Sequence, residues 1–244
     1  MQIIAVVNEK GGTGKSTTAA ALAQAAAAQG KKALALDLNP QGNLSFSLGA
    51  DMRQGSTFDL LEGRRAARLI QTSPTGPDVI PASRSNTTVT SSRGSAKRLR
   101  AALLPIQLAY DLIVIDTPNA MGELVYNALQ AATGLLIPLL ADLYSLQGLY
   151  EMVDLAAQMR ESNPALTKTG IIITNYTARS NIDKQMHQNI IEAARDLNIE
   201  FYGTIRAGKD VREAQAFQQN LFTAAPKSKP AQDYIAVYNK IMEV

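Results

Sequence analysis

The chain has 244 residues, of which 46% are hydrophobic and 18% are charged, as in a folded globular domain and unlike a disordered or fibrous chain. Its formal net charge of +3 is a mild excess that permits contact with phosphate groups without requiring it. The absence of cysteine excludes a disulfide scaffold and thiolate-ligated zinc or iron–sulfur sites. Aromatic residues are few and include no tryptophan, which disfavours base stacking as a way to hold nucleic acid.

Short apolar runs alternate with helical patterns along the whole chain. Residues 2–7 are predicted to form a strand, and residues 16–29 a helix of strong helix formers that ends before Gly30. In chain order, further strands are predicted at residues 33–38, 78–80, 112–116, 135–139, 170–174 and 200–205. Further helices are predicted at residues 95–109, with a bend at Pro105, and at 145–160, 182–197, 211–219 and 231–242.

This alternation predicts an α/β fold in which a mostly parallel, twisted sheet carries helices on both faces. Outside the strand at 78–80, residues 72–94 are rich in Ser, Thr, Pro and Gly and are expected to be surface loops. No internal repeat or linker divides the sequence, so we expect residues 1–244 to form a single domain. With no signal-peptide pattern and no stretch of ~20 apolar residues, a cytoplasmic protein without membrane attachment is expected.

A glycine-rich loop, KGGTGKST, occupies residues 10–17 between the first strand and the first helix, as a phosphate-binding loop requires. Its glycines allow successive backbone N–H groups to point at an anion, Lys15 can reach the β- and γ-phosphates, and the Ser16 hydroxyl can ligate Mg²⁺. ATP and Mg²⁺ are therefore the expected cofactors, and the fold is of the P-loop NTPase type. The expected nucleotide-binding residues of this loop are Lys10, Gly11, Gly12, Thr13, Gly14, Lys15, Ser16 and Thr17.

The loop departs from the general pattern, which would place glycine at position 9, because it has Glu9 followed by Lys10. This form resembles the deviant Walker A motif of the ParA/MinD family. In that family the first lysine contacts nucleotide phosphate, commonly across a dimer interface, so the resemblance implies a catalytic role for Lys10 beside Lys15. The alternative is that Lys10 is a solvated loop lysine.

The resemblance covers nearly the whole chain. Residues 33–43, ALALDLNPQGN, are similar to the family's second signature, and residues 110–118, YDLIVIDTP, to its Walker B strand. Segments 122–129, 137–149 and 226–234 are also similar to ParA-like partition proteins. The magnesium site is therefore expected to include Ser16 and Asp116, with Asp37 assisting.

Asn39 stands where the family's second signature has an acidic residue, which the resemblance assigns to orienting or activating the attacking water. An amide cannot act as a base near pH 7, so we hypothesise slow ATP hydrolysis, whether Asn39 is natural or introduced. The alternative is that Asn39 is simply suited to a turn before Pro40.

DNA binding, if present, is expected from the surface of the ATPase domain, because no helix-turn-helix precedes the phosphate loop. The resemblance favours a group formed by Arg206, Lys209, Arg212, Lys227 and Lys229. A second basic group consists of Arg84, Arg93, Lys97, Arg98 and Arg100. Either group could instead be ordinary solvated charge.

Two single residues and the last helix also bear on function. Asn175, at the end of a strand, could touch the adenine or could be a turn residue. His187, the only histidine, is interpreted as a surface residue. The last helix has Tyr234, Tyr238 and Ile241 on one stripe, which predicts packing on the sheet more than membrane binding, because the helix lacks a basic cluster.

The sequence therefore predicts a DNA-partitioning ATPase that forms a homodimer with ATP, binds DNA non-specifically, associates with the nucleoid and has a ParB-like adaptor. The alternative is a MinD-like nucleotide-gated protein that acts on a protein or membrane platform. A metabolic ligase on the same scaffold is disfavoured by Lys10 and by the lack of a second-substrate motif.

Overall fold

The computed structural model describes residues 1–89, 95–178 and 180–243. In this part of the chain, one sheet has the strand order β3-β4-β2-β5-β1-β6-β7-β8, in which β3 runs antiparallel to β4 and all other neighbouring pairs are parallel. Its strands are β1 (Gln2–Val6), β2 (Ala33–Asp37), β3 (Gln71–Thr72), β4 (Asp78–Ile80), β5 (Leu112–Asp116), β6 (Gly134–Leu139), β7 (Lys168–Tyr176) and β8 (Glu200–Arg206). The expected α/β fold with a mostly parallel sheet is confirmed.

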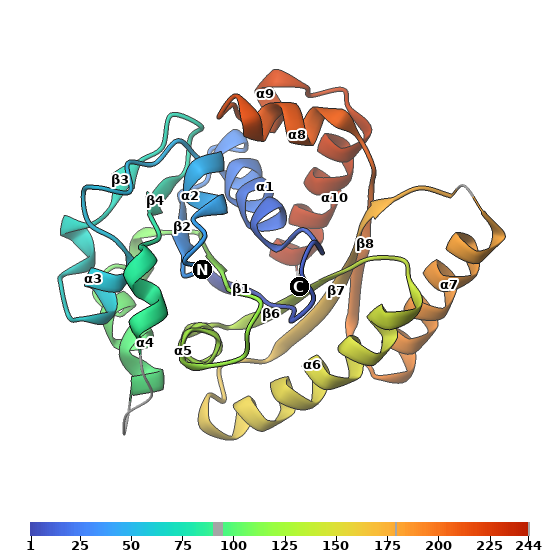
Figure 1. Cartoon of the computed structure of the whole chain (residues 1–244), viewed down its shortest axis with the longest axis horizontal. Helices are drawn as coiled ribbons and strands as arrows, with labels where there is room; N and C mark the ends of the chain where they lie inside the picture. The colour runs from blue at the N-terminus through green and yellow to red at the C-terminus, as the bar shows by residue number, and fades with distance from the viewer. Residues whose placement is uncertain (90–94, 179, 244) are drawn as a thin grey trace.

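Helices cover both faces of the sheet (Figure 1). On one face lie α1 (Lys15–Ala28), α2 (Asn43–Ser47), α8 (Lys209–Ala216), α9 (Leu221–Ala224) and α10 (Lys229–Glu243). On the other lie α3 (Thr57–Leu61), α4 (Arg98–Leu103), α5 (Glu123–Ala131), α6 (Leu143–Ser162) and α7 (Asn181–Asp196). Short 3₁₀ turns are η1 (Ala66–Arg68), η2 (Arg84–Thr88), η3 (Ser95–Lys97) and η4 (Gln107–Ala109).

The central strand β1 supplies both layers of the core. Ile3 and Ala5 point into the apolar cluster under α5 and α6, whereas Ile4 and Val6 point into the cluster under α1 and α10. This alternation follows from the period of two along a strand, and burial on both faces explains why the strand sequences are almost wholly apolar. The strand ends that carry the phosphate loop are therefore fixed in a rigid core.

The last helix uses its apolar stripe inside the protein. Tyr234, Tyr238 and Ile241 of α10 are buried, and the Tyr234 hydroxyl lies 3.3 Å from the Thr18 hydroxyl of α1. The predicted packing of this helix is confirmed, and its stripe is not available to a membrane. Among the described helices, none is both long enough and apolar enough to cross a bilayer.

The structure differs from the sequence prediction around Pro105. The helix predicted over residues 95–109 is instead the sequence η3–α4–η4, with α4 ending at Leu103. A proline ring clashes with the carbonyl of the preceding helical turn, so the helix breaks here and does not merely bend. The prediction also omitted the short edge strand β3 and the helices α2, α3, α5 and α9. In α5 the N-cap is Gly122, which provides no side-chain cap.

Candidate nucleotide-binding site

The carboxyl ends of three adjacent central strands meet at one edge of the sheet. In the strand register, Asp116 of β5 lies opposite Val6 of β1 on one side and Asp37 of β2 on the other. The phosphate loop follows β1 directly, so the loop and both carboxylates share this edge. Ligands of open α/β sheets bind at this kind of position. We call this region the nucleotide edge.

The phosphate loop has the backbone conformation that its glycines allow. Gly12 and Gly14 have φ values of 76° and 83°, in the left-handed region that side chains with a Cβ rarely adopt. Gly14 is the N-cap of α1 and provides no side chain to bond the first N–H groups of the helix. These N–H groups therefore remain available for phosphate oxygens at the positive end of the helix.

Lys15 is buried in the loop, where its Nζ atom donates to Asn119 Oδ1 at 2.6 Å and to the Lys10 carbonyl at 3.2 Å. Burial lowers the pKa of Lys15, while the charge of Asp116 opposes that shift. The ammonium group is thus held by neutral acceptors at the centre of the site, which an incoming phosphate can replace.

Ser16 and Asp116 fit a magnesium site. The Ser16 hydroxyl donates to Asp116 Oδ2 at 2.5 Å, and Asp116 Oδ1 is buried without a hydrogen-bond partner. Among the described residues, no three Asp, Glu, His or Cys side chains are grouped to hold a metal by themselves. Mg²⁺ normally takes one or two protein oxygens and completes its shell with water and substrate phosphates, which is the chemistry that this pair offers.

Asp37 is fully buried and anchors the loop that follows β2. Its Oδ2 accepts from the Ser45 backbone N–H at 2.9 Å and from the Ser45 hydroxyl at 2.7 Å, and its Oδ1 accepts from the Asn39 N–H at 3.1 Å. Burial raises the pKa of Asp37 to about 6, despite these hydrogen bonds, and both burial and the Asp37 charge raise the pKa of Asp116. Two buried carboxyl groups side by side favour a cation between them or nearby. A ligand role for Asp37 remains a prediction.

Asn39 lines a cavity of about 420 Å³ next to the phosphate loop, together with Lys15, Ser16 and Asn119. Its side-chain Oδ1 accepts from the Gln41 N–H at 3.1 Å, as in a turn in which the side chain of an Asn caps the backbone two residues later. Asn39 thus makes a turn contact and also faces the phosphate loop, and its role in hydrolysis stays a prediction.

Lys10 is held by an ion pair in the structure. Its Nζ lies 2.5 Å from Asp142 Oδ2 and 5.8 Å from the centre of the Tyr144 ring. Asp142 is also the N-cap of α6, because its Oδ1 accepts from the Ser145 N–H and hydroxyl at 3.0 Å. Lys10 is thus not a freely solvated lysine, but its ammonium group is engaged outside the loop that would cradle the phosphates.

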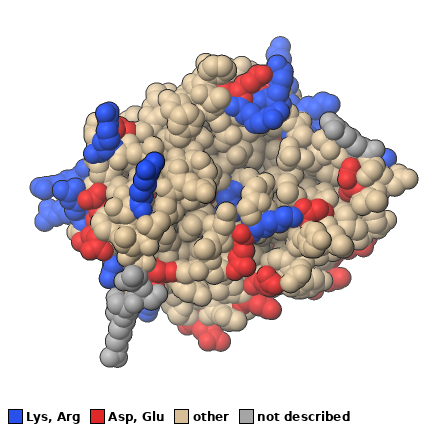
Figure 2. All heavy atoms as spheres, viewed as in Figure 1, with Lys and Arg blue, Asp and Glu red and all other residues tan. Residues whose placement is uncertain are grey.

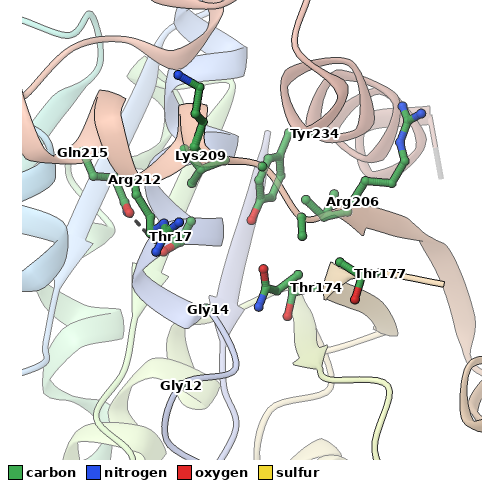
Figure 3. Close-up of a pocket in the computed structure, with 15 residues that line it drawn as sticks. Gly12, Gly14, Thr17, Thr174, Thr177, Arg206, Lys209, Arg212, Gln215 and Tyr234 are labelled. Carbon is green, nitrogen blue, oxygen red and sulfur yellow. Dashed lines mark hydrogen bonds between the residues drawn. The ribbon is translucent and has the colours of Figure 1, made fainter. Parts of the chain in front are cut away.

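A larger cavity of about 710 Å³ opens beside Gly12, Gly14 and Thr17, and Figure 3 shows it between the phosphate loop, the end of β7 and α8. Asn175 lines it from the end of β7, with a φ of 51°. Both interpretations of Asn175 thus agree with its place, because it adopts a turn conformation beside a space large enough for a nucleoside. Gln215 of α8 closes one wall by donating to the Thr17 hydroxyl at 3.1 Å.

The basic residues favoured for DNA binding differ in their surroundings. Arg206 makes a two-pronged ion pair with Asp233, with contacts of 2.6 and 2.8 Å, and Lys209 pairs with Glu213 at 3.2 Å. Arg212 is exposed, and Figure 3 draws it toward Thr17 while Lys209 and Arg206 point away from the cavity. Lys227 and Lys229 are exposed beside α10. Whether these residues bind DNA stays a prediction.

The other basic group is only partly described. Arg84, Lys97 and Arg100 are exposed, Arg98 pairs with Glu62 at 3.3 Å, and Arg93 lies outside the described residues. Distant acidic residues therefore reduce the charge of both groups.

The sequence did not indicate three residues of the site, which are Asn119, Asp142 and Gln215. Asn119 directly follows the quoted YDLIVIDTP segment and Asp142 lies within the quoted segment 137–149, but no local signal indicated Gln215.

Comparison with known proteins agrees with this geometry. A family described as an AAA domain matches residues 1–168. The chromosome partitioning protein ParA of Myxococcus xanthus is 32% identical over 99% of this chain and 88% of its own length. The chromosome-partitioning ATPase Soj of Thermus thermophilus is 32% identical over 98% of this chain and 94% of its own length. The chain belongs to the ParA family of P-loop partition ATPases.

Solved structures show the same fold at lower identity. A McdA–ATP complex from Cyanothece superposes with a TM-score of 0.85 at 22% identity, covering 100% of this chain and 95% of that one. A cobyrinic acid a,c-diamide synthase from Mycobacterium smegmatis with a bound ATP analogue and magnesium gives 0.83 at 24%, with coverage of 100% and 95%. MinD of Pyrococcus furiosus gives 0.79 at 21%, with coverage of 99% and 98%. These likenesses confirm the P-loop fold that this ParA-family member shares with proteins of several functions.

Proposed function

We propose that this chain is an ATP-driven partition protein that dimerises around ATP–Mg²⁺, holds DNA without regard to sequence and releases it on slow hydrolysis. The observation that carries the proposal is the buried, unpartnered Asp116 Oδ1 beside Ser16 and the uncapped start of α1. Membership of the ParA family supports partition as the process served.

Nucleotide binding would use the residues of the phosphate loop. The N–H groups from Gly11 to Thr17 would receive the phosphates, and Lys15 would exchange Asn119 for a phosphate oxygen. Ser16 and Asp116 would hold Mg²⁺, which neutralises phosphate charge. The 710 Å³ cavity beside Asn175 would take the nucleoside.

Dimerisation would engage Lys10. In the structure its ammonium is paired with Asp142, so Lys10 adds no charge to its own phosphate loop. Leaving that pair would let Lys10 neutralise phosphate charge, as a second cation does in phosphoryl transfer. This exchange of partners would couple nucleotide binding to association.

DNA binding would follow from the dimer. One chain offers few uncompensated cations, because Arg206 and Lys209 are paired with acids. A dimer doubles the phosphate contacts, and the release of counterions then strengthens binding steeply and makes it salt-dependent. Arg212, Lys227 and Lys229 are the residues that we assign to this surface, with Arg206 and Lys209 beside them.

Hydrolysis would be slow because of Asn39. Its amide faces the cavity of the phosphate loop but its oxygen is committed to Gln41, and an amide takes up no proton near neutral pH. The ATP-bound state would therefore persist, with a ParB-like adaptor as the partner expected to shorten it.

Sedimentation velocity with ATP–Mg²⁺, ADP–Mg²⁺ or no nucleotide tests the proposal. We expect a dimer with ATP–Mg²⁺ alone and loss of that dimer in Lys10→Ala, with ATP still bound by the monomer. A chain that stays monomeric with ATP–Mg²⁺, or a dimer that ignores nucleotide, would contradict it. Turnover that depends on an added small carboxylic acid would point instead to a ligase on this fold.

A further inference from the structure

A second recess lies between α3, η1 and α4, on a part of the molecule that shares no lining residue with the two nucleotide cavities. Its volume is about 600 Å³, and its floor is mainly apolar. The apolar lining residues are Leu60, Leu61, Ala66, Ala67, Ala101, Ala102, Pro105 and Ile106. Arg98, which pairs with Glu62, also lines the recess.

Arginines border this recess on one side. Arg64 and Arg65 line the apolar recess and also an adjoining cavity of about 520 Å³, which adds Arg68 and Gln54. The three arginines are exposed, and Figure 2 shows blue side chains gathered at the left of the molecule, in the region of α3 in Figure 1. We call the two adjoining cavities together the arginine groove.

The groove carries positive charge that neighbouring acidic residues do not fully neutralise. Arg64 pairs with Asp59 at 3.2 Å, but within the described ranges neither Arg65 nor Arg68 has a hydrogen bond or ion pair from its side chain. The net charge of the groove is therefore positive, next to an apolar floor.

Exposed apolar side chains flank Pro105 and Ile106 along the chain. Leu104 is 58% exposed and Leu108 is 85% exposed, so the segment after α4 presents large apolar groups to solvent. Single exposed leucines are ordinary, but here two of them flank residues that line an apolar recess, and exposed apolar groups that gather in this way are typical of an interaction site.

We propose that the arginine groove docks an amphipathic helix of a partner protein, with apolar residues at helical spacing on the floor and acidic residues over Arg64, Arg65 and Arg68. An amphipathic helix lays its apolar face into a groove of this kind, and carboxylates on its flank complement the guanidinium groups. Duplex DNA offers the negative charge but no apolar stripe for the floor.

Two helices of a second copy of this chain are poor occupants, because Ile190 of α7 and Tyr234 of α10 are buried against the sheet. Exposed apolar side chains do occur on α6, at Leu143, Tyr144 and Tyr150. The occupant that we propose is a different protein that brings the acidic flank, and self-association of this chain is an outcome of the test below.

One wall of the groove is bonded to the nucleotide edge and the other to α5. In α3, the Thr57 hydroxyl donates to the Asp37 carbonyl at 2.7 Å. In α4, the Leu99 N–H donates to Asn127 Oδ1 at 3.0 Å, and Asn127 in turn donates to the Glu123 carbonyl at the start of α5. A helix docked in the groove would thus touch α3, which is bonded to Asp37, without contacting the residues that line the two nucleotide cavities.

Fluorescence anisotropy with three labelled peptides tests this proposal. The first is a stapled helix of ~15 residues, a length at which unstapled helices are marginal, with leucines at i, i+3, i+4 and i+7 and glutamates on the flanks. The second is a scrambled peptide of the same composition, and the third has lysine in place of glutamate. We expect the wild-type chain to bind the first peptide at least ~10-fold more tightly than the other two.

Variants locate the binding. The double variant Arg65→Glu, Arg68→Glu should lose at least ~10-fold in affinity for the acidic helix and should gain affinity for the lysine peptide. Ala102→Glu should weaken the binding of both the acidic helix and the lysine peptide, because its longer, charged side chain occupies the apolar floor of the groove. Arg195→Glu, the same change on exposed α7, should alter nothing. Circular dichroism of each variant shows that it is folded.

Several results would overturn the proposal. These are equal binding of the acidic and scrambled peptides, no effect of the variants, or nucleotide-independent self-association of the wild type that the double variant abolishes. Loss of ATP-dependent DNA binding in the double variant, without acidic-helix binding in the wild type, would make the groove a DNA surface. Failure of the proposed partition function would appear separately, as absent ATP-dependent DNA binding in the wild type.

Discussion

The nucleotide edge and the arginine groove differ in whether their cationic side chains have a partner inside the protein. At the nucleotide edge, Lys15 is held by Asn119 and Lys10 by Asp142, so both lysines of the phosphate loop already have a partner. In the groove, Arg64 and Arg98 are paired with acidic residues, but Arg65 and Arg68 have no such partner among the described residues. Arg65 also lines the apolar recess.

This difference shows how each region is suited to its ligand. A small anion such as a nucleotide can replace internal partners one by one inside a preformed site, because the partners hold the cations in place until it arrives. A macromolecular partner brings its own counter-charges and apolar surface, so a groove for it can remain uncompensated. Substitutions at the nucleotide edge should therefore change ATP and DNA binding and leave acidic-helix binding intact, and the reverse should hold for the groove.

The largest effect is expected from Lys15→Ala. Loss of a buried, charge-assisted contact to phosphate should weaken ATP binding at least ~100-fold and abolish ATP-dependent DNA binding. Isothermal titration with ATP–Mg²⁺ measures the first and anisotropy with labelled DNA the second, with Lys31→Ala as the surface control. Acidic-helix binding that fell along with ATP binding would break the separation of the two regions.

Asn39→Asp should raise ATP turnover at least ~10-fold, because a carboxylate at this position can accept a proton from water where the amide cannot. Phosphate release under saturating ATP measures the rate. Asn43→Asp adds the same charge to the same cavity and should leave turnover unchanged. If Asn39→Asp showed no gain, the role assigned to this position would be wrong.

Arg212→Ala should weaken DNA binding in the ATP state and make the salt dependence less steep by about 2 in log–log slope, since a dimer loses two phosphate contacts. Because Arg212 also borders the 710 Å³ cavity, ATP affinity is measured in parallel and should be unchanged. The matched change Arg65→Ala should leave the slope as it is. If Arg65→Ala changed the salt dependence of DNA binding and Arg212→Ala did not, the arginine groove would be the DNA-binding surface.

Asp142→Asn should lower the ATP concentration needed for dimerisation by a few-fold, a modest effect because the ion pair is partly exposed. The amide keeps an acceptor for the Ser145 N–H but releases Lys10 from its counter-charge. Sedimentation velocity across an ATP series measures the shift. Asp154→Asn removes the same charge farther along α6 and should have no effect, and a higher ATP requirement in Asp142→Asn would contradict the partner exchange.

The smallest effect concerns His187, which lies away from both regions. It is half-buried, and its Nε2 lies 2.8 Å from the Thr204 hydroxyl. Its ring packs against that of Tyr176 at 4.5 Å between centroids with a tilt of 35°, so it is more enclosed than the surface residue that the sequence predicted. Burial lowers its pKa from the ordinary 6.5. The neutral ring is thus favoured in the folded state, and its stabilisation is complete above pH 6.5 and lost as pH falls through the folded pKa.

NMR titration of the single histidine should therefore give a midpoint below 6.5. The unfolding free energy of the wild type should fall relative to that of His187→Gln as pH decreases below 6.5. A midpoint at or above 6.5 would contradict this assignment.

The sequence predicted the nucleotide edge well and the arginine groove not at all, for physical reasons. The phosphate loop, Asp116 and the strands before them are local: glycines, a lysine and a run of buried apolar residues determine the structure where they stand. The groove joins residues 60–68 to residues 98–106, which only the folded chain brings together. The sequence also predicted one helix through Pro105, and this helix gave no reason to expect an apolar segment exposed after α4.

The ion-pair partners of the basic residues were also distant in the sequence. The sequence placed Arg206 in a basic group, but Asp233, 27 residues away, neutralises it in the structure. Lys10 was expected near phosphate, yet Asp142, 132 residues away, holds it. Side chains that converge from distant segments decide which charges are available, and no local pattern reports them.

Binding of unrelated DNA duplexes by the purified chain, measured by anisotropy across a salt series, tests the central claim most directly. The account predicts binding with ATP–Mg²⁺ that weakens steeply with salt and is equal for different sequences, and no binding with ADP–Mg²⁺ or without nucleotide. DNA binding that ignores nucleotide, or its absence in every nucleotide state, would contradict it.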